Sequence, residues 1–132
     1  MAVAHEMLYT SMQAMHITGA TRNNIEYWVT TGLVTPEFLG RKSHGHQWSF
    51  RNLVELQVLV ELRKRSRLGY MQWRRIAMLV TESPSLSTTV IVHKGKAQLV
   101  SNETSLSIPE YAVVVSVAMI ESNLRATLGL TG

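Results

Sequence analysis

The order of apolar and polar residues predicts two short helices near the start of the chain. The first follows hydroxyl residues at 9–11 and stops at Gly19, residue types that suit a helix start and a helix end. The second is expected to begin at Thr21 and to end at Gly32. Its inward face is indicated by three apolar residues at helical spacing, Ile25, Trp28 and Val29. Two short helices separated only by residues 19–20 have the spacing of a helix-turn-helix.

A β-hairpin and a long helix are predicted next. Pro36 disfavours helix before it. In residues 37–48, an apolar pair at 38–39 is followed by a basic tip at 40–45 with a glycine at each end, and residues 46–48 form the returning strand. Beside a helix-turn-helix, such a hairpin is called a wing. Ser49 is a suitable N-cap for the longest helix, which ends in a basic run at 63–67 that complements the helix dipole. A further amphipathic helix is expected over residues 71–80.

The last third of the chain has a different pattern. Residues 82–87 resemble a linker. Three strands and a closing helix are expected at residues 88–93, 96–101, 112–117 and 119–128. The expected fold class is therefore α+β, with one domain at residues 1–83 and a small α+β module at residues 84–132. The tryptophans and most of the seven methionines are expected to lie in the core.

The composition argues against catalysis. The chain has 132 residues, of which 45% are apolar and 17% charged, as in a globular protein. It contains no cysteine and no aspartate, which excludes disulfides and thiolate chemistry and argues against carboxylate-bound metals and aspartate triads. We find no glycine-rich phosphate loop and no carboxylate pair. We therefore expect no enzymatic activity, no cofactor and no metal site, the His44–His46 pair included.

The net charge of +4 is concentrated in one region. Residues 41–75 carry nine basic residues against two glutamates, a local charge of +7, whereas residues 84–132 are neutral. This asymmetry points to a polyanionic partner, for which nucleic acid is the usual candidate. The first residues do not have the pattern of a secretory signal, and no apolar run is long enough to span a bilayer. The expectation is a cytoplasmic, nucleoid-associated protein without a membrane partner.

Three segments in order resemble the MerR family of bacterial transcription regulators. Residues 17–28 read Ile-Thr-Gly-Ala-Thr-Arg-Asn-Asn-Ile-Glu-Tyr-Trp, residues 31–36 read Thr-Gly-Leu-Val-Thr-Pro, and residues 48–56 read Trp-Ser-Phe-Arg-Asn-Leu-Val-Glu-Leu. The resemblance covers residues 9–80. It implies a winged helix-turn-helix, double-stranded DNA as the partner and regulation of transcription. We expect a homodimer on a palindromic site, and repression rather than activation because of the departures described below.

The resemblance also assigns roles to residues. The helix at 21–30 would be the recognition helix in the major groove, where arginine pairs with guanine and asparagine with adenine. Tyr27 would contact phosphate, the wing would follow the backbone or the minor groove, and Arg51 would support the wing or contact phosphate. The expected DNA-binding residues are Thr21, Arg22, Asn23, Asn24, Tyr27, Arg41, Lys42, His44 and Arg51.

The sequence departs from the family in three respects. Glu26 stands where the family often has arginine, and the segment before Ser49 lacks the arginine that usually precedes the wing's Tyr-Ser. After Val80, Pro84 and the β-prone runs replace the long dimerising helix of many members. Activation by twisting the promoter spacer, which depends on that helix, is therefore not expected.

Two other functions remain open. One is an autoregulating antitoxin that binds DNA through residues 9–80 and a toxin through residues 84–132. The other is an architectural or excisionase-like factor that binds cooperatively and bends DNA. The neutral tail, residues 84–132, is expected to dimerise the protein or to bind another protein.

Overall fold

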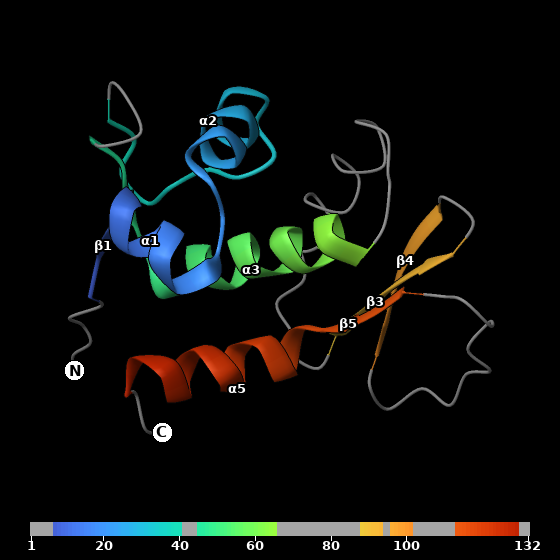
Figure 1. The fold of residues 1–132 in the computed structure, drawn as a ribbon. Coiled ribbons are helices and arrows are strands. Elements are labelled where there is room, and N and C mark those ends of the chain that lie inside the picture. Colours follow the sequence, from blue (N-terminus) through green and yellow to red (C-terminus); the bar gives the residue numbers. More distant parts are fainter. Residues whose placement is uncertain (1–6, 41–44, 66–87, 94–95, 102–112, 130–132) are drawn as a thin grey trace.

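The computed structural model describes residues 7–40, 45–65, 88–93, 96–101 and 113–129, and within them the fold class is α+β, as predicted. The elements are β1 (Tyr9–Thr10), α1 (Ser11–Thr18), α2 (Arg22–Thr30), β2 (Gln47–Trp48), α3 (Phe50–Arg65), β3 (Thr88–His93), β4 (Lys96–Ser101), β5 (Val113–Ser116) and α5 (Val117–Leu128). In Figure 1, α3 lies in the middle, with α2 on one side of it and α5 on the other. The helix and linker predicted over residues 71–80 and 82–87 lie outside the described residues.

Three helices begin with the same reciprocal cap. Thr10 Oγ1 accepts the Gln13 N–H at 3.1 Å, while Gln13 Oε1 accepts the Thr10 N–H at 2.8 Å. The second and third pairs, Thr21 with Asn24 and Ser49 with Asn52, make the same two bonds. Each pair satisfies two backbone donors that a helix start leaves without partners. The N-caps predicted at positions 21 and 49 are confirmed.

The turn between α1 and α2 depends on a left-handed glycine. Gly19 has φ 82° and its N–H donates to Met15 O at 2.8 Å, which ends α1. A side chain at this φ is strained, whereas glycine is not. The Thr18 hydroxyl accepts the N–H of Ala20 at 3.2 Å and so fixes the next step of the turn. The predicted glycine stop of the first helix is confirmed.

A small sheet forms around the return strand of the predicted hairpin. β2 pairs with β1 in antiparallel register, Tyr9 opposite Trp48 and Thr10 opposite Gln47. Phe38 pairs with Gln47 from the other side through an isolated bridge. Successive strand residues face opposite sides. Tyr9 and Trp48 are accordingly buried, while Thr10, Gln47 and Phe38 form an exposed outer row.

The core is built around α3, which is apolar on several sides. Val58, Leu59 and Val60 are buried in succession, more than one amphipathic face would hide. The reason is that α1 packs on one side of α3 and α5 on another. Residues of the tail belong to the same hydrophobic cluster as those of α3, namely Val115, Val117, Ile120 and Leu124.

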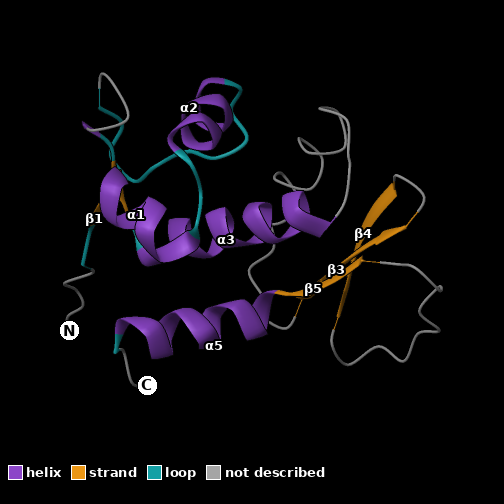
Figure 2. Cartoon of the chain, in the orientation of Figure 1, coloured by secondary structure: helices purple, strands orange, loops and turns teal. Residues whose placement is uncertain are grey.

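The C-terminal strands form an antiparallel sheet with strand order β4-β3-β5. β3 and β4 pair in register from Thr88 opposite Ser101 to His93 opposite Lys96, which confirms the predicted hairpin. β5 leads directly into α5, which begins two residues earlier than predicted. At the far end of α5, the Arg125 guanidinium lies 4.8 Å from the centroid of the Phe50 ring and its Nε lies 2.9 Å from Glu121 Oε1. Figure 2 shows this helix beside α3.

The prediction that most methionines lie in the core is wrong for three of those described. Met7 and Met119 are 65% exposed and Met12 is 70% exposed. The buried positions of α1 are instead small residues, Ser11, Ala14 and Thr18. Small side chains let α1 approach α3 closely, and this leaves Met12 on the outer side of the helix.

Candidate nucleic-acid interface

The first turn of α2 presents polar side chains to solvent. Arg22 and Asn23 are exposed there, whereas Ile25 and Trp28 anchor the opposite face of the helix in the core. The first turn contains no acidic residue, so the positive end of the helix dipole lies beside Arg22 and Asn23, and Glu26 follows on the next turn. This end of the helix is suited to an anionic partner.

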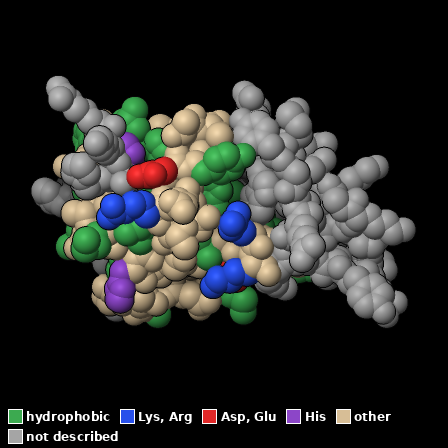
Figure 3. Space-filling view, turned by 45° about the horizontal axis from the view of Figure 1, so that its top comes forward, with side chains coloured by type: hydrophobic (Ala, Val, Ile, Leu, Met, Phe, Trp, Pro, Cys, Tyr) green, Lys and Arg blue, Asp and Glu red, His purple; other side chains and the backbone are tan. Residues whose placement is uncertain are grey.

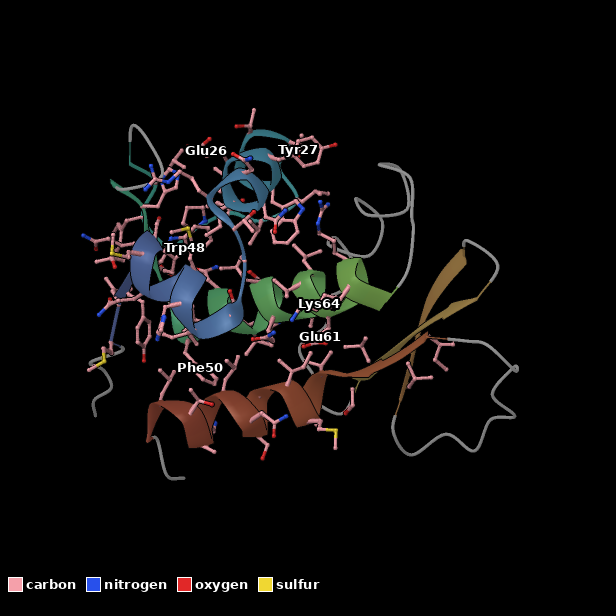
Figure 4. The ribbon with its side chains drawn as sticks, in the orientation of Figure 1. Glu26, Tyr27, Trp48, Phe50, Glu61 and Lys64 are labelled. Atoms are coloured by element: carbon pink, nitrogen blue, oxygen red, sulfur yellow. The ribbon has the colours of Figure 1, made fainter. Side chains whose placement is uncertain are left out.

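The next turn of α2 continues the exposed face. Glu26 and Tyr27 lie on the outer side of the helix in Figure 4, and Tyr27 is 51% exposed. A phenol at this place reaches outward with a hydroxyl that both donates and accepts hydrogen bonds. Figure 3 shows blue, red and green side chains on the same side of the molecule, so this face is mixed in charge rather than uniformly basic.

Two of the predicted contact residues hold the helix start. Thr21 Oγ1 accepts the Asn24 N–H at 3.0 Å, and Asn24 Oδ1 accepts the Thr21 N–H at 3.2 Å. The side-chain oxygens of Thr21 and Asn24 are thus engaged within the chain. Arg22 and Asn23 lie between Thr21 and Asn24 in the sequence. The two cap bonds therefore fix the backbone from which the side chains of Arg22 and Asn23 project.

Side chains of α3 support the turn before α2. Gln57 Nε2 donates to Thr18 O at 3.1 Å and contacts Glu61 Oε1 at 3.4 Å. The Lys64 ammonium lies beside Gly19, since a Cβ built on that glycine would be 4.0 Å from Nζ. Figure 4 shows Glu61 and Lys64 on α3. Lys64 therefore lies at the negative end of α1, where a cation is favourable. The sequence pattern does not indicate this long-range support.

The hairpin closes at a narrow neck. A Cβ on Gly40 would collide with the backbone of Gly45, so the two strands meet where neither residue carries a side chain. The Gly40 N–H donates to His46 Nδ1 at 2.9 Å. His46 is buried and its ring meets that of Trp48 edge to face, with centroids 6.0 Å apart. Its Nδ1 is engaged in closing the neck rather than available to a metal.

One buried asparagine ties the hairpin to α3. Asn52 Oδ1 accepts the N–H groups of Glu37 at 2.8 Å and Ser49 at 3.0 Å. Its Nδ2 donates to Thr35 O at 3.0 Å and to Glu55 Oε1 at 3.2 Å. The entry and the exit of the hairpin are thus bonded to the same side chain.

The remaining predicted contact residues lie at or near the hairpin. Arg51, in the first turn of α3, has its Nε 3.7 Å from Glu55 Oε2 and keeps 39% of its side chain exposed. The wing-tip residues Arg41, Lys42 and His44 lie outside the described residues. Trp48 is fully buried and its Nε1 donates to Ser11 Oγ at 2.9 Å, so the prediction of a core anchor is confirmed.

The neck provides a test of how the hairpin is held. Gly40→Ala is expected to push the two strands apart and to lower the free energy of unfolding by about 2 kcal/mol, because the added methyl meets backbone that cannot turn away. Chemical denaturation monitored by tryptophan fluorescence measures this change. The control is Gly32→Ala, where φ is 80° but the Cβ meets no atom within 4 Å; the strained backbone alone is expected to cost about 1 kcal/mol. Equal losses for both variants would contradict a tight neck.

No protein-family model matches this sequence, and no curated protein is significantly similar to it. In the described part of the chain, no group of three histidine or glutamate side chains is placed to hold a metal ion. Nor does any described helix have the length and apolar character needed to cross a membrane.

Proposed function

We propose that this protein is a sequence-specific DNA-binding transcription regulator with a MerR-like winged helix-turn-helix. The observation that carries the proposal is the exposed first turn of α2, which holds Arg22 and Asn23 outward while Ile25 and Trp28 fix the helix on the core. A helix held in this way, beside a hairpin on the same side of the molecule, fits the major groove.

In the proposed complex, α2 reads bases and the surrounding residues bind the backbone. Arg22 donates to guanine O6 and N7 and Asn23 pairs with adenine, each contributing about 1–3 kcal/mol of discrimination. Tyr27, Arg51 and the wing residues Arg41, Lys42 and His44 contact phosphates or the minor groove. Thr21 and Asn24 hold the first turn rigid, so that little side-chain and backbone freedom is lost on binding.

The proposed regulator represses transcription as a homodimer on a palindromic site, because two recognition helices double the contacts with DNA. The buried apolar residues of α5 are not available for this dimer contact. Val117, Ile120 and Leu124 are buried within the chain's own core, and Met119 is the exposed large apolar residue of the helix.

Selection from a random pool of duplexes tests the function directly. The full chain is expected to enrich one sequence with two-fold symmetry and to bind it far more tightly than unselected DNA at the same salt concentration. Binding of equal strength to all duplexes would favour the architectural factor instead. Absence of binding to any duplex would overturn the proposal.

Two single substitutions separate base reading from phosphate binding. Asn23→Ala is expected to relax the preference at one base pair by about 1–3 kcal/mol, whereas Lys42→Ala weakens binding to all sequences and lowers the salt slope by about 1. Fluorescence-anisotropy titrations at several salt concentrations measure both. Asn123→Ala on α5 makes the same change at an exposed asparagine on the other side of α3 and is expected to have no effect. Equal effects of the first two variants on selected and unselected DNA would contradict the assignment.

A further inference from the structure

An acidic side chain lies within the exposed face of α2. The exposed residues of this helix are Arg22, Asn23, Glu26, Tyr27 and Thr30. With about 3.6 residues per turn, Glu26 projects between the directions of Arg22 and Asn23, one turn further along the helix. Figure 4 shows Glu26 on the outer side of α2. A DNA groove that takes up this face of the helix therefore also takes up the carboxylate.

The two charges of this face stand in the order that stabilises a helix less. Arg22 lies in the first turn, at the positive end of the helix dipole, and Glu26 lies on the second turn, beyond the reach of that dipole. An acid four residues before a base is the favourable order, and α5 has it, with Glu121 Oε1 2.9 Å from Arg125 Nε. α2 has the reverse order. Charges that contribute little to the helix itself point to a partner outside the chain.

The chemistry of a carboxylate selects the part of DNA that it can contact. Phosphates bind cations and repel a carboxylate, so contact with the DNA backbone alone would be weakened by Glu26. An ionised carboxylate only accepts hydrogen bonds, and the donors in the major groove are the N4 amino group of cytosine and the N6 amino group of adenine. Adenine places its N7 acceptor beside N6, where a second carboxylate oxygen is repelled. Cytosine is therefore the base that matches Glu26.

We propose that Glu26 determines specificity by accepting a hydrogen bond from the N4 amino group of a cytosine in the major groove. This inference rests on the proposed DNA-binding function. Arg22 and Asn23, one turn earlier on the same face, contact the adjoining base pairs. On any other sequence the carboxylate meets base acceptors or phosphates, and the repulsion lowers the affinity. The same side chain thus strengthens binding to the correct site and weakens binding elsewhere.

The test removes the amino group from the DNA and the carboxylate from the protein. The probe is the duplex that the full-length protein selects from a random pool, with each cytosine in turn replaced by a pyrimidin-2-one nucleotide, which lacks the N4 amino group. At one cytosine, the replacement is expected to weaken wild-type binding by on the order of tenfold. It is expected to leave the affinity of Glu26→Ala unchanged, because this variant has no acceptor there. Fluorescence-anisotropy titrations measure both affinities.

A second selection, with Glu26→Gln, tests the identity of the base. An amide carries a donor beside its oxygen and pairs with N6 and N7 of adenine, so this variant is expected to select adenine in place of the cytosine. The matched control is Glu37→Gln at an exposed glutamate of the hairpin entry, which removes the same charge and is expected to keep the cytosine. Thermal unfolding by circular dichroism checks that each variant is folded.

Three results overturn the cytosine contact and leave the DNA-binding function standing. One is a wild-type protein that tolerates loss of the amino group at every cytosine of the selected site, a result that requires no variant to fold. Another is a Glu26→Ala protein with the wild-type sensitivity to that loss. The third is a Glu26→Gln protein that loses preference only at a guanine, because the carboxylate then acts by positioning Arg22. A wild-type protein that selects no sequence overturns both proposals.

Discussion

Trp48→Ala is expected to lower the free energy of unfolding by about 4 kcal/mol, close to the whole stability of many small domains. The indole is fully buried where β2 meets β1, and its Nε1 donates to Ser11 in the first turn of α1. Its removal leaves a cavity between the small sheet, α1 and α3, and it leaves the buried Ser11 hydroxyl without this donor. Urea denaturation monitored by far-ultraviolet circular dichroism measures the loss.

Two variants separate the contributions of Trp48. Trp48→Phe keeps most of the apolar volume and removes the Nε1 donor, so we expect a loss of about 1–2 kcal/mol. Tyr27→Ala, at an exposed aromatic on α2, is expected to change stability by less than about 0.5 kcal/mol. A Trp48→Ala protein that unfolds at the wild-type urea concentration would show that the hairpin base does not support the core.

Asn52→Ala is expected to cost about 3 kcal/mol. The substitution removes one side chain but leaves three backbone groups without their partners, the N–H groups of Glu37 and Ser49 and the carbonyl of Thr35. A buried polar group left unsatisfied costs about 1–3 kcal/mol, and the reciprocal cap of α3 is lost as well. Denaturation curves of the variant and the wild type measure the difference.

The same substitution is expected to weaken the proposed binding to DNA even where the protein stays folded. Asn52 fixes both ends of the hairpin, so its loss frees the wing and raises the entropy lost on binding. Asn23→Ala is the matched control for stability, since the same side chain is removed from an exposed helix position. Asn52→Asp keeps the oxygen acceptor but puts a charge beside Glu55, and we expect a loss similar to that of alanine. An unchanged free energy of unfolding in both Asn52 variants would contradict the view that this side chain holds the hairpin to α3.

The helices and their boundaries could be predicted because their signals are local. Hydroxyl residues before an apolar run and a glycine after it lie within a few positions of the backbone groups that they satisfy. The starts of α2 and α3 and the glycine that ends α1 were all indicated in this way. The antiparallel pairing of β3 and β4 was also indicated, since two β-prone runs close in sequence form a hairpin.

Features that depend on distant partners could not be predicted from the pattern. β1 is two residues long and exists because β2, almost forty positions later, pairs with it. Met12 of α1 was expected inside because it is apolar, but the buried positions of this helix are small residues instead. Likewise, nothing in the order of residues indicates that Arg125 lies over Phe50.

The sequence allowed some residues of the candidate interface to be predicted. Arg22, Asn23 and Tyr27 are exposed on α2, as a contact surface requires. Thr21 and Asn24 were grouped with them because they are polar and adjacent, whereas the structure engages their side-chain oxygens in a cap. A residue type alone does not tell whether a polar atom serves the backbone or a partner, and the three-residue spacing of the caps is the signal that separates the two.

The packing of α5 on α3 limits which fragments of this protein can be expected to keep the native fold. Phe50, the first residue of α3, lies two residues after the return strand of the hairpin, and the Arg125 guanidinium of α5 lies over its ring. A fragment that stops before the tail would leave one flank of α3 open to water and prone to association with other copies. The smallest piece able to show the native behaviour of the α2 side, where we propose that DNA binds, therefore includes α5. A tag fused after α5 needs a spacer that leaves this helix packed on α3.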